Sequence, residues 1–186
     1  PHKESVLNHL DAIDPMAKKI GAVNTIINRD GRLVGYNTDC KAAIQALDDI
    51  NQTPATGTKN DRLKGRHVTL LGAGGAARAI AFGLQERGAQ VTIVNRNYKR
   101  AQSLAQDVGC ISMEFDNLPG IKTDILINAT PVGMFPMVNE TPIDKDRLKP
   151  DMIVFDTIYN PIETRLLREA KNQGCKIVGG LPMFVN

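Results

Sequence analysis

A glycine-rich run after an apolar stretch has the clearest capacity for chemistry in this sequence. The run Gly72-Ala73-Gly74-Gly75-Ala76-Ala77 directly follows the apolar stretch Val68–Leu71. It fits the pattern G-x-G-x-x-G/A, in which Gly72 allows a tight turn, Gly74 lets the backbone approach a pyrophosphate, and Ala77 permits close helix packing. A helix that starts there directs free N–H groups and a positive dipole end at phosphates. The run predicts a dinucleotide-binding loop, and a glycine-rich structural turn is the alternative.

The end of the next apolar stretch indicates which dinucleotide binds. An NAD site expects Asp or Glu there, about 20 residues past the loop, to hold the ribose hydroxyls. The sequence instead reads Val94-Asn95-Arg96-Asn97-Tyr98-Lys99-Arg100, with cations and no carboxylate. The planar guanidinium groups of Arg96 and Arg100 suit a 2′-phosphate, whereas a solvated helix start is the alternative. Because cations are mildly unfavourable at a helix N-terminus, a bound phosphate explains their presence better than solvation does. Asn95, Arg96 and Arg100 therefore favour NADP as the cofactor.

Short apolar runs alternate with helical segments beyond residue 64, and these elements must position the loop. The runs expected to be strands are His67–Leu71, Gln90–Val94, Ile111–Glu114, Ile125–Ile127, Ile153–Phe155 and Lys176–Val178. The segments expected to be helices are Ala76–Arg87, Tyr98–Asp107 and Thr164–Gln173. Gly88 and Gly174 stand where glycine commonly ends a helix. Strands that alternate with helices predict an α/β fold with a doubly wound parallel sheet, the Rossmann arrangement.

The first part of the chain predicts a helix, a hairpin and a second helix. The segment Ile20 to Asn28 is largely apolar and β-branched, and Arg32 to Tyr36 is the second candidate strand. Asp30-Gly31 lies between them and readily adopts the positive φ angles that a two-residue hairpin turn needs.

A second helix is expected after the hairpin. Ala43, Leu47 and Ile50 recur at helical spacing, so they form one apolar face. Asn37 or Thr38 is the expected N-terminal cap, because their side-chain oxygens accept hydrogen bonds from free backbone N–H groups.

The composition excludes several classes of protein. The chain has 186 residues, 42% hydrophobic and 23% charged, with a net charge of +3. That mixture is typical of a globular protein, and the scattered charges do not indicate nucleic-acid binding. The three cysteines, Cys40, Cys110 and Cys175, lack zinc or redox spacing, which predicts reduced thiols in the cytoplasm and no metal site. We expect no membrane span or secretory leader, and the opening Pro1-His2-Lys3 suggests a cut rather than a natural start.

Several segments, in one order along nearly the whole chain, resemble the shikimate dehydrogenase family, which includes shikimate/quinate dehydrogenases. They are Pro1-His2-Lys3, Ile20-Gly21-Ala22-Val23-Asn24-Thr25, Gly35-Tyr36-Asn37-Thr38-Asp39, the Gly72 loop, Asn95-Arg96, Asn128-Ala129-Thr130-Pro131-Val132-Gly133-Met134, Tyr159-Asn160-Pro161 and Gly179-Gly180-Leu181-Pro182-Met183. The resemblance implies reversible reduction of 3-dehydroshikimate to shikimate with NADPH, in aromatic amino-acid biosynthesis.

The resemblance also implies two domains. Residues 1–50 are expected to be part of an α/β substrate-binding domain, incomplete here, and residues 64–180 the NADP-binding Rossmann domain. Residues 51–63 are expected to be a linker, because that run is polar and holds one large apolar residue, Leu63. Residues 181–186 are expected to begin the return to the substrate domain.

Lys3 and Asp39 match the family's catalytic lysine and its paired aspartate. Hydride addition places negative charge on the ketone oxygen, so a proton donor is needed nearby. The Lys3 ammonium can donate to that oxygen, while Asp39 orients the lysine and bonds a substrate hydroxyl. Taken alone, Lys3 would be interpreted as a frayed, solvated residue and Asp39 as a helix N-terminal residue. The flanking residues Pro1, Asn37 and Thr38 favour the catalytic interpretation.

Further positions match the family's binding residues. Asn24 and Tyr159 resemble substrate-binding residues, and Thr130, Gly180 and Met183 resemble residues near the nicotinamide. The other interpretations are a strand-end position for Asn24, a turn before proline for Thr130 and a core position for Met183.

The sequence departs from the family pattern in places. Ala42 stands where the family usually has glycine, and Asn97 where threonine is common. The family's serine pair and glutamine that bind substrate would precede Pro1 and follow Asn186, so we expect poor turnover from the isolated chain. A quinate dehydrogenase, a non-catalytic NADP- or shikimate-binding regulator, and a portion of a multifunctional polypeptide are the alternatives.

Overall fold

A six-stranded parallel sheet forms the centre of the computed structural model, which describes residues 2–50, 62–120 and 122–185. Its strands are β4 (His67–Leu71), β5 (Gln90–Val94), β6 (Ile111–Met113), β7 (Ile125–Asn128), β8 (Ile153–Asp156) and β9 (Lys176–Val178). Their order is β6-β5-β4-β7-β8-β9, so the direction of winding reverses between β4 and β7. In such sheets, ligands bind outside the carboxyl ends of the strands at that reversal. The α/β class and the doubly wound sheet are confirmed.

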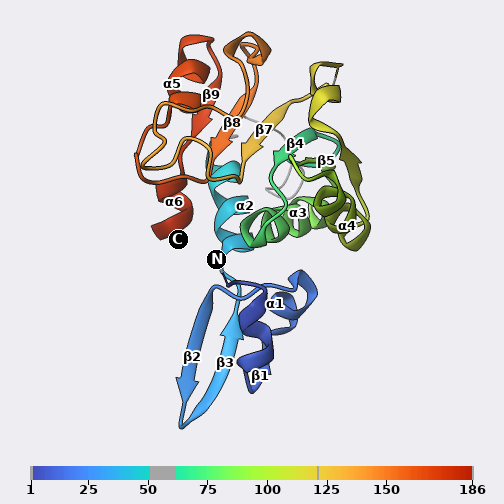
Figure 1. The fold of residues 1–186 in the computed structure, drawn as a ribbon, viewed down its shortest axis with the longest axis vertical. Helices are drawn as coiled ribbons and strands as arrows, with labels where there is room; N and C mark the ends of the chain where they lie inside the picture. Colours follow the sequence, from blue (N-terminus) through green and yellow to red (C-terminus); the bar gives the residue numbers. More distant parts are fainter. Residues whose placement is uncertain (1, 51–61, 121, 186) are drawn as a thin grey trace.

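Helices cover the sheet (Figure 1) and begin or end near the predicted residues. They are α3 (Gly75–Glu86), α4 (Tyr98–Val108), α5 (Arg165–Asn172) and the short α6 (Gly180–Val185), with 3-10 turns at η3 (Phe115–Gly120) and η4 (Lys145–Arg147). Thr164 caps α5 by accepting from the N–H of Leu167. Gly88 and Gly174 have φ angles of 71° and 82°, so both helices end in the left-handed conformation that the sequence predicted.

A small sheet with order β1-β3-β2 lies apart from the large sheet, below it in Figure 1. It consists of β1 (Ala12–Ile13), β2 (Thr25–Arg29) and β3 (Arg32–Tyr36), preceded by the 3-10 turn η1 (Ser5–His9). β2 and β3 pair antiparallel, and the turn residues Asp30 and Gly31 have φ angles of 53° and 87°. The predicted hairpin turn is therefore confirmed.

The predicted start of the hairpin at Ile20 is wrong. Ile20 is the last residue of α1 (Pro15–Ile20), and β2 begins only at Thr25. Asp14 starts this helix by accepting from the N–H groups of Met16 and Ala17, and Gly21 ends it with a φ of 69°. Ile20 is fully buried at the end of that helix, whereas the β-branched residues Thr25–Ile27 do lie in β2.

The helix α2 (Asp39–Ile50) joins the small sheet to the large one and lies against α3 (Figure 1). Asn37 supplies the predicted cap, because its Oδ1 accepts from the N–H of Cys40 at 3.3 Å. The two helices approach closely: a Cβ atom added at Gly83 would lie 2.8 Å from the Cys40 sulfur. The predicted linker falls largely on residues 51–61, which lie outside the described residues.

The part of the chain that the structure describes contains no helix of the length and hydropathy needed to cross a membrane. The three cysteines are free. Burial raises the pKa of Cys40 and of Cys110 to about 11, so neither thiol ionises readily near neutral pH.

Candidate active site

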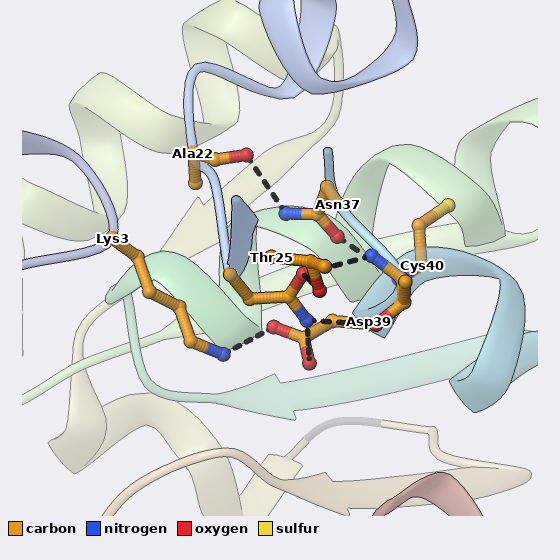
Figure 2. A network of polar contacts seen from close by, with 8 residues as sticks. Lys3, Ala22, Thr25, Asn37, Asp39 and Cys40 are labelled. Carbon is orange, nitrogen blue, oxygen red and sulfur yellow. Dashed lines mark hydrogen bonds and ion pairs between the residues drawn. The ribbon is translucent and has the colours of Figure 1, made fainter. Parts of the chain in front are cut away.

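Lys3, Asp39 and Asn24 form one polar group beside the glycine loop. Figure 2 shows the Lys3 side chain directed at the Asp39 carboxylate. The Lys3 ammonium donates to Oδ2 of Asp39, and Asn24 Nδ2 donates to the other carboxylate oxygen at 2.9 Å. The Lys3 side chain is 32% exposed and that of Asp39 14%. The ammonium therefore reaches solvent or a ligand while the carboxylate is held from two sides.

Backbone contacts of three separate segments hold this group in place. The N–H of Val23 donates to the Lys3 carbonyl oxygen at 2.8 Å. Asn24 Oδ1 accepts from the N–H of Thr38 at 3.0 Å, immediately before Asp39 begins α2. Asn37 Nδ2 donates to the carbonyl of Ala22 at 2.9 Å, as Figure 2 shows. Asp39 is thus a helix N-terminal residue and an ion-pair partner at once.

The glycine loop joins β4 to α3 and lies directly beside this group. Gly72 has a φ of 115°, and a Cβ atom there would lie 2.8 Å from the carbonyl oxygen of Ala129. A Cβ atom at Gly75 would lie 2.9 Å from Cβ of Lys3. At Gly74, by contrast, an added Cβ atom meets none of the described residues within 4 Å, and its φ of −99° is ordinary. The protein's own packing explains glycine at 72 and 75 but not at 74.

A pocket of about 470 Å³ connects the loop to the polar group. Its walls include Lys3, Glu4, Gly74–Ala76 and Arg100. No side chain of the described residues caps the N-terminus of α3, so the N–H groups of its first turn remain available to a ligand. The pocket therefore offers the free backbone donors of α3 beside the Lys3 side chain, whose ammonium is paired with Asp39.

The loop after β5 supplies the predicted cations. Arg96 is exposed, and Arg100 Nη2 lies 4.0 Å from a carboxylate oxygen of Glu4, with both side chains more than half exposed. Asn95 Nδ2 donates to the Asn97 carbonyl at 3.0 Å, which shapes the turn between the strand and α4. Lys99 is the other exposed cation of this turn.

The ends of β7 and β8 carry a buried polar network. Asn128, Asp156 and Thr164 are all 0% exposed. Asp156 accepts from Thr164 Oγ1 at 2.7 Å and from Asn128 Nδ2 at 3.1 Å. Asn128 Oδ1 in turn accepts from both the N–H and the hydroxyl of Thr130, at 3.0 and 2.6 Å. The network fixes Thr130 beside the loop, where a Cβ atom at Gly72 would lie 3.4 Å from its methyl group.

Burial raises the pKa of Asp156 to about 6, although hydrogen bonds from Thr164, Ile158 and Asn128 act to lower it. A folded-state pKa above the unfolded value means that the folded protein binds the proton more tightly, so this stabilisation is lost as pH rises through about 6. Relative to Asp156→Asn, the free energy of unfolding of the wild type should fall by roughly 2 kcal/mol between about pH 4.5 and about pH 7.5. Urea unfolding of both proteins at the two pH values measures this. A difference independent of pH would contradict the raised pKa.

The remaining predicted residues lie at the ends of β8 and β9. Tyr159 is 51% exposed and stacks on Phe184 of α6, with ring centroids 4.8 Å apart. Gly180 begins α6, where an added Cβ atom would collide with the Thr157 carbonyl oxygen. Met183 packs against the main core, which agrees with the alternative interpretation of that residue. Among the described residues, the polar contacts of the Lys3 group do not include Tyr159.

Three residues to which the sequence patterns assign no role have buried or bridging contacts: Asp156 and Thr164 in the buried polar network, and Arg78, whose guanidinium contacts Ile20 and Asp107. Asp156 directly follows the apolar run Ile153–Phe155, and Arg78 interrupts the apolar stretch from Val68 to Leu84. A charged residue inside or at the end of a buried run is the signal that could have identified both, because such a group needs a partner.

Comparison with known proteins agrees with this geometry. The family model described as shikimate / quinate 5-dehydrogenase matches residues 55–165, and that of the shikimate dehydrogenase substrate binding domain matches residues 1–26. The chain is 45% identical to the bifunctional 3-dehydroquinate dehydratase/shikimate dehydrogenase of Arabidopsis thaliana, over 100% of this chain and 32% of that protein. It is 42% identical to the shikimate dehydrogenase (NADP(+)) of Bacillus cereus, over 100% of this chain and 66% of that protein.

A solved structure shows the same arrangement of elements. Shikimate 5-dehydrogenase from Thermus thermophilus, in complex with NADP(H) and shikimate, superposes with a TM-score of 0.84 at 38% identity. The superposition covers 99% of this chain and 66% of that chain. The chain thus spans slightly less than two thirds of the Bacillus relative and about a third of the Arabidopsis one.

Proposed function

Because the chain belongs to the shikimate/quinate dehydrogenase family, we propose that the protein catalyses the reversible, NADPH-dependent reduction of 3-dehydroshikimate to shikimate. One observation carries the proposal. Lys3 is ion-paired with Asp39 and packed against Gly75, so a proton donor lies directly beside the glycine loop. A ketone reductase needs this juxtaposition, because hydride and proton must reach the same carbonyl group.

The residues around the pocket fit an NADP cofactor. Glycine at 74 leaves space that the described residues do not fill, which suits a backbone that approaches a pyrophosphate. The end of β5 carries Arg96 and Arg100 and lacks the carboxylate of an NAD site. When bound, NADPH supplies the hydride. Asn95 would shape the turn that holds the 2′-phosphate.

The chain's own residues account for the proton and the orientation of the substrate. The Lys3 ammonium donates a proton to the substrate oxygen as negative charge develops there, and in the reverse direction the neutral amine takes it back. Asp39 keeps Lys3 oriented and accepts a hydrogen bond from a substrate hydroxyl. Asn24, already bonded to Asp39 at 2.9 Å, offers an amide to a second hydroxyl.

Other residues take supporting roles in the proposal. Thr130 and Gly180 line the nicotinamide side from the ends of β7 and β9, and Tyr159 contacts substrate. Met183, which is partly buried against the main core, also lies on the nicotinamide side in this proposal. The pathway is aromatic amino-acid biosynthesis in the cytoplasm.

The domain assignment is part of the same proposal. Residues 1–50 belong to the substrate-binding domain, 51–63 to a linker and 64–180 to the NADP domain. Residues 181–186 begin the segment that leads back to the substrate-binding domain. α2 ends at Ile50, the last residue of the proposed substrate-binding part, and packs its apolar face against α3 of the NADP domain, so it forms a contact between the two domains.

Assay of the full-length protein with NADP⁺ or NAD⁺, each with shikimate or quinate, tests the proposal. We expect the highest kcat/KM with NADP⁺ and shikimate. A preference for NAD⁺ and quinate would support the quinate dehydrogenase alternative instead. Binding of NADP or shikimate without turnover would support a regulatory role.

Substitution of the two arginines tests the phosphate site. Arg96→Ala or Arg100→Ala should each raise the KM for NADP⁺ by about 10- to 100-fold, because each removes a charge-assisted hydrogen bond to the 2′-phosphate. The KM for NAD⁺ should stay within about 2-fold, since NAD⁺ lacks that phosphate. Lys99→Ala, which removes an exposed cation from the same turn, is the matched control. An equal rise in the KM for NADP⁺ and for NAD⁺ would show that the arginines do not bind the 2′-phosphate.

A further inference from the structure

Arg78 connects the glycine loop to the substrate-facing part of the chain. It lies in the first turn of α3, and its backbone N–H donates to the Gly74 carbonyl at 2.8 Å. Its side chain, 22% exposed, donates from Nε to the carbonyl oxygen of Ile20, the last residue of α1. One residue therefore contacts the loop through its backbone and the end of α1 through its side chain.

The guanidinium group of Arg78 is held from several sides. Its Nη2 lies 2.8 Å from a carboxylate oxygen of Asp107 on α4, and its central carbon is 5.8 Å from the ring centroid of Phe82. A Cβ atom added at Gly21 would lie 3.1 Å from Nε. A cation at a helix C-terminus also interacts favourably with the helix dipole. The side chain thus has a defined position at the end of α1.

Residues 20–24, the connecting segment, follow directly and bond to the proposed catalytic group. The carbonyl of Ala22 accepts from Asn37 at 2.9 Å. The N–H of Val23 donates to the Lys3 carbonyl, and the Asn24 side chain donates to Asp39. The position of the connecting segment relative to α3 therefore sets where the proton-donating group lies relative to the loop.

We infer that Arg78 is a positioning residue, which fixes the proton-donating group of Lys3 and Asp39 at the right distance from the bound dinucleotide. The inference rests on the proposed function. The described contacts of the Arg78 side chain reach the Lys3 group only through Ile20 and the connecting segment. A displacement of about 1 Å between reacting groups can lower turnover by about 100-fold, even when the substituted residue lies far from the reacting atoms.

Arg78→Met in the full-length protein tests the inference. We expect kcat for shikimate oxidation to fall by about 10- to 100-fold, while the dissociation constant for NADP⁺, measured by calorimetry, stays within about 2-fold. The primary isotope effect with deuterated shikimate should rise, because hydride transfer becomes slower relative to product release. Arg78→Lys keeps one donor for the Ile20 carbonyl and should recover part of the lost kcat.

Hydrogen exchange of the cofactor-free protein gives a second measurement that does not depend on turnover. The amides of Ala22, Val23 and Asn24 should exchange faster in Arg78→Met, because the segment loses its anchor on α3. Lys19→Ala is the matched control: it removes the exposed pair between Lys19 and Glu86, 2.6 Å apart, which joins the same two helices. This control should leave both kcat and the exchange rates unchanged.

The outcomes separate the inference from the proposed function. The inference would be overturned if Arg78→Met kept the wild-type kcat and the wild-type exchange rates. It would also be overturned if stability, NADP⁺ affinity and kcat all fell together, because that would indicate general damage to the fold. If the wild type does not oxidise shikimate, the proposed function fails, and faster exchange in Arg78→Met alone would still support the positioning of residues 20–24.

Discussion

Replacement of Lys3 by alanine in the full-length protein should lower kcat for shikimate oxidation by about three orders of magnitude, within the range expected for loss of a positioned acid–base group. In the proposed mechanism Lys3 accepts the hydroxyl proton in this direction, and in the other it donates to the forming alkoxide. The side chain packs against Gly75 and is paired with Asp39. NADP⁺ affinity should change little, because the backbone of the glycine loop remains intact. Steady-state kinetics and calorimetry measure the two effects separately.

A second lysine provides the control for this substitution. Lys18→Ala removes an exposed lysine from the last turn of α1 and should retain wild-type kcat. Exposed surface substitutions rarely change stability by more than about 0.5 kcal/mol. Wild-type turnover in Lys3→Ala would show that the proton comes from another group, and the proposed mechanism would then be wrong.

Gly74→Ala should abolish most NADP⁺ binding while the protein stays folded. An added methyl group meets none of the described residues within 4 Å and the φ angle of −99° suits alanine, so the melting temperature should be unchanged or slightly higher. The same methyl group would occupy the space into which the pyrophosphate must fit. We expect the dissociation constant for NADP⁺ to rise at least about 30-fold, or roughly 2 kcal/mol. Thermal unfolding and calorimetry give the two values.

Gly72→Ala is the contrasting variant in the same loop. Its Cβ atom would lie 2.8 Å from the Ala129 carbonyl oxygen at a φ of 115°, so it should destabilise the protein with or without cofactor. Wild-type NADP⁺ affinity in Gly74→Ala would mean that the loop is a structural turn, the alternative that the sequence left open.

Local sequence patterns were sufficient to predict the large sheet. Each strand is a short apolar run, and Gly88 and Gly174 end helices through their own backbone freedom, so neighbours in the sequence decide these elements. The segment from Ile20 was assigned wrongly because its β-branched residues fit a strand equally well. The left-handed Gly21 and the cap from Asp14, which make Ile20 a helix end, depend on backbone geometry that periodicity does not contain.

The candidate site was predictable only in part, for a similar reason. Lys3 and Asp39 are 36 residues apart, and their pairing was inferred from the family resemblance rather than from spacing. The network of Asn128, Asp156 and Thr164 joins the ends of two strands and a helix. Arg78 and Ile20 meet across 58 residues. Such contacts are set by the packing of whole elements, which a single sequence does not specify.

The close approach of α2 to α3 has a consequence for how the protein tolerates mutation. Both helices begin at the candidate site, α2 with Asp39 and α3 with Gly75, and Gly83 lies two turns further along against Cys40 and Ile44. A side chain at 83 would press on the side chains of Cys40 and Ile44, and Cys40 directly follows Asp39 at the start of α2. A buried interface that lies outside both the glycine loop and the Lys3 group therefore bears on the spacing between them.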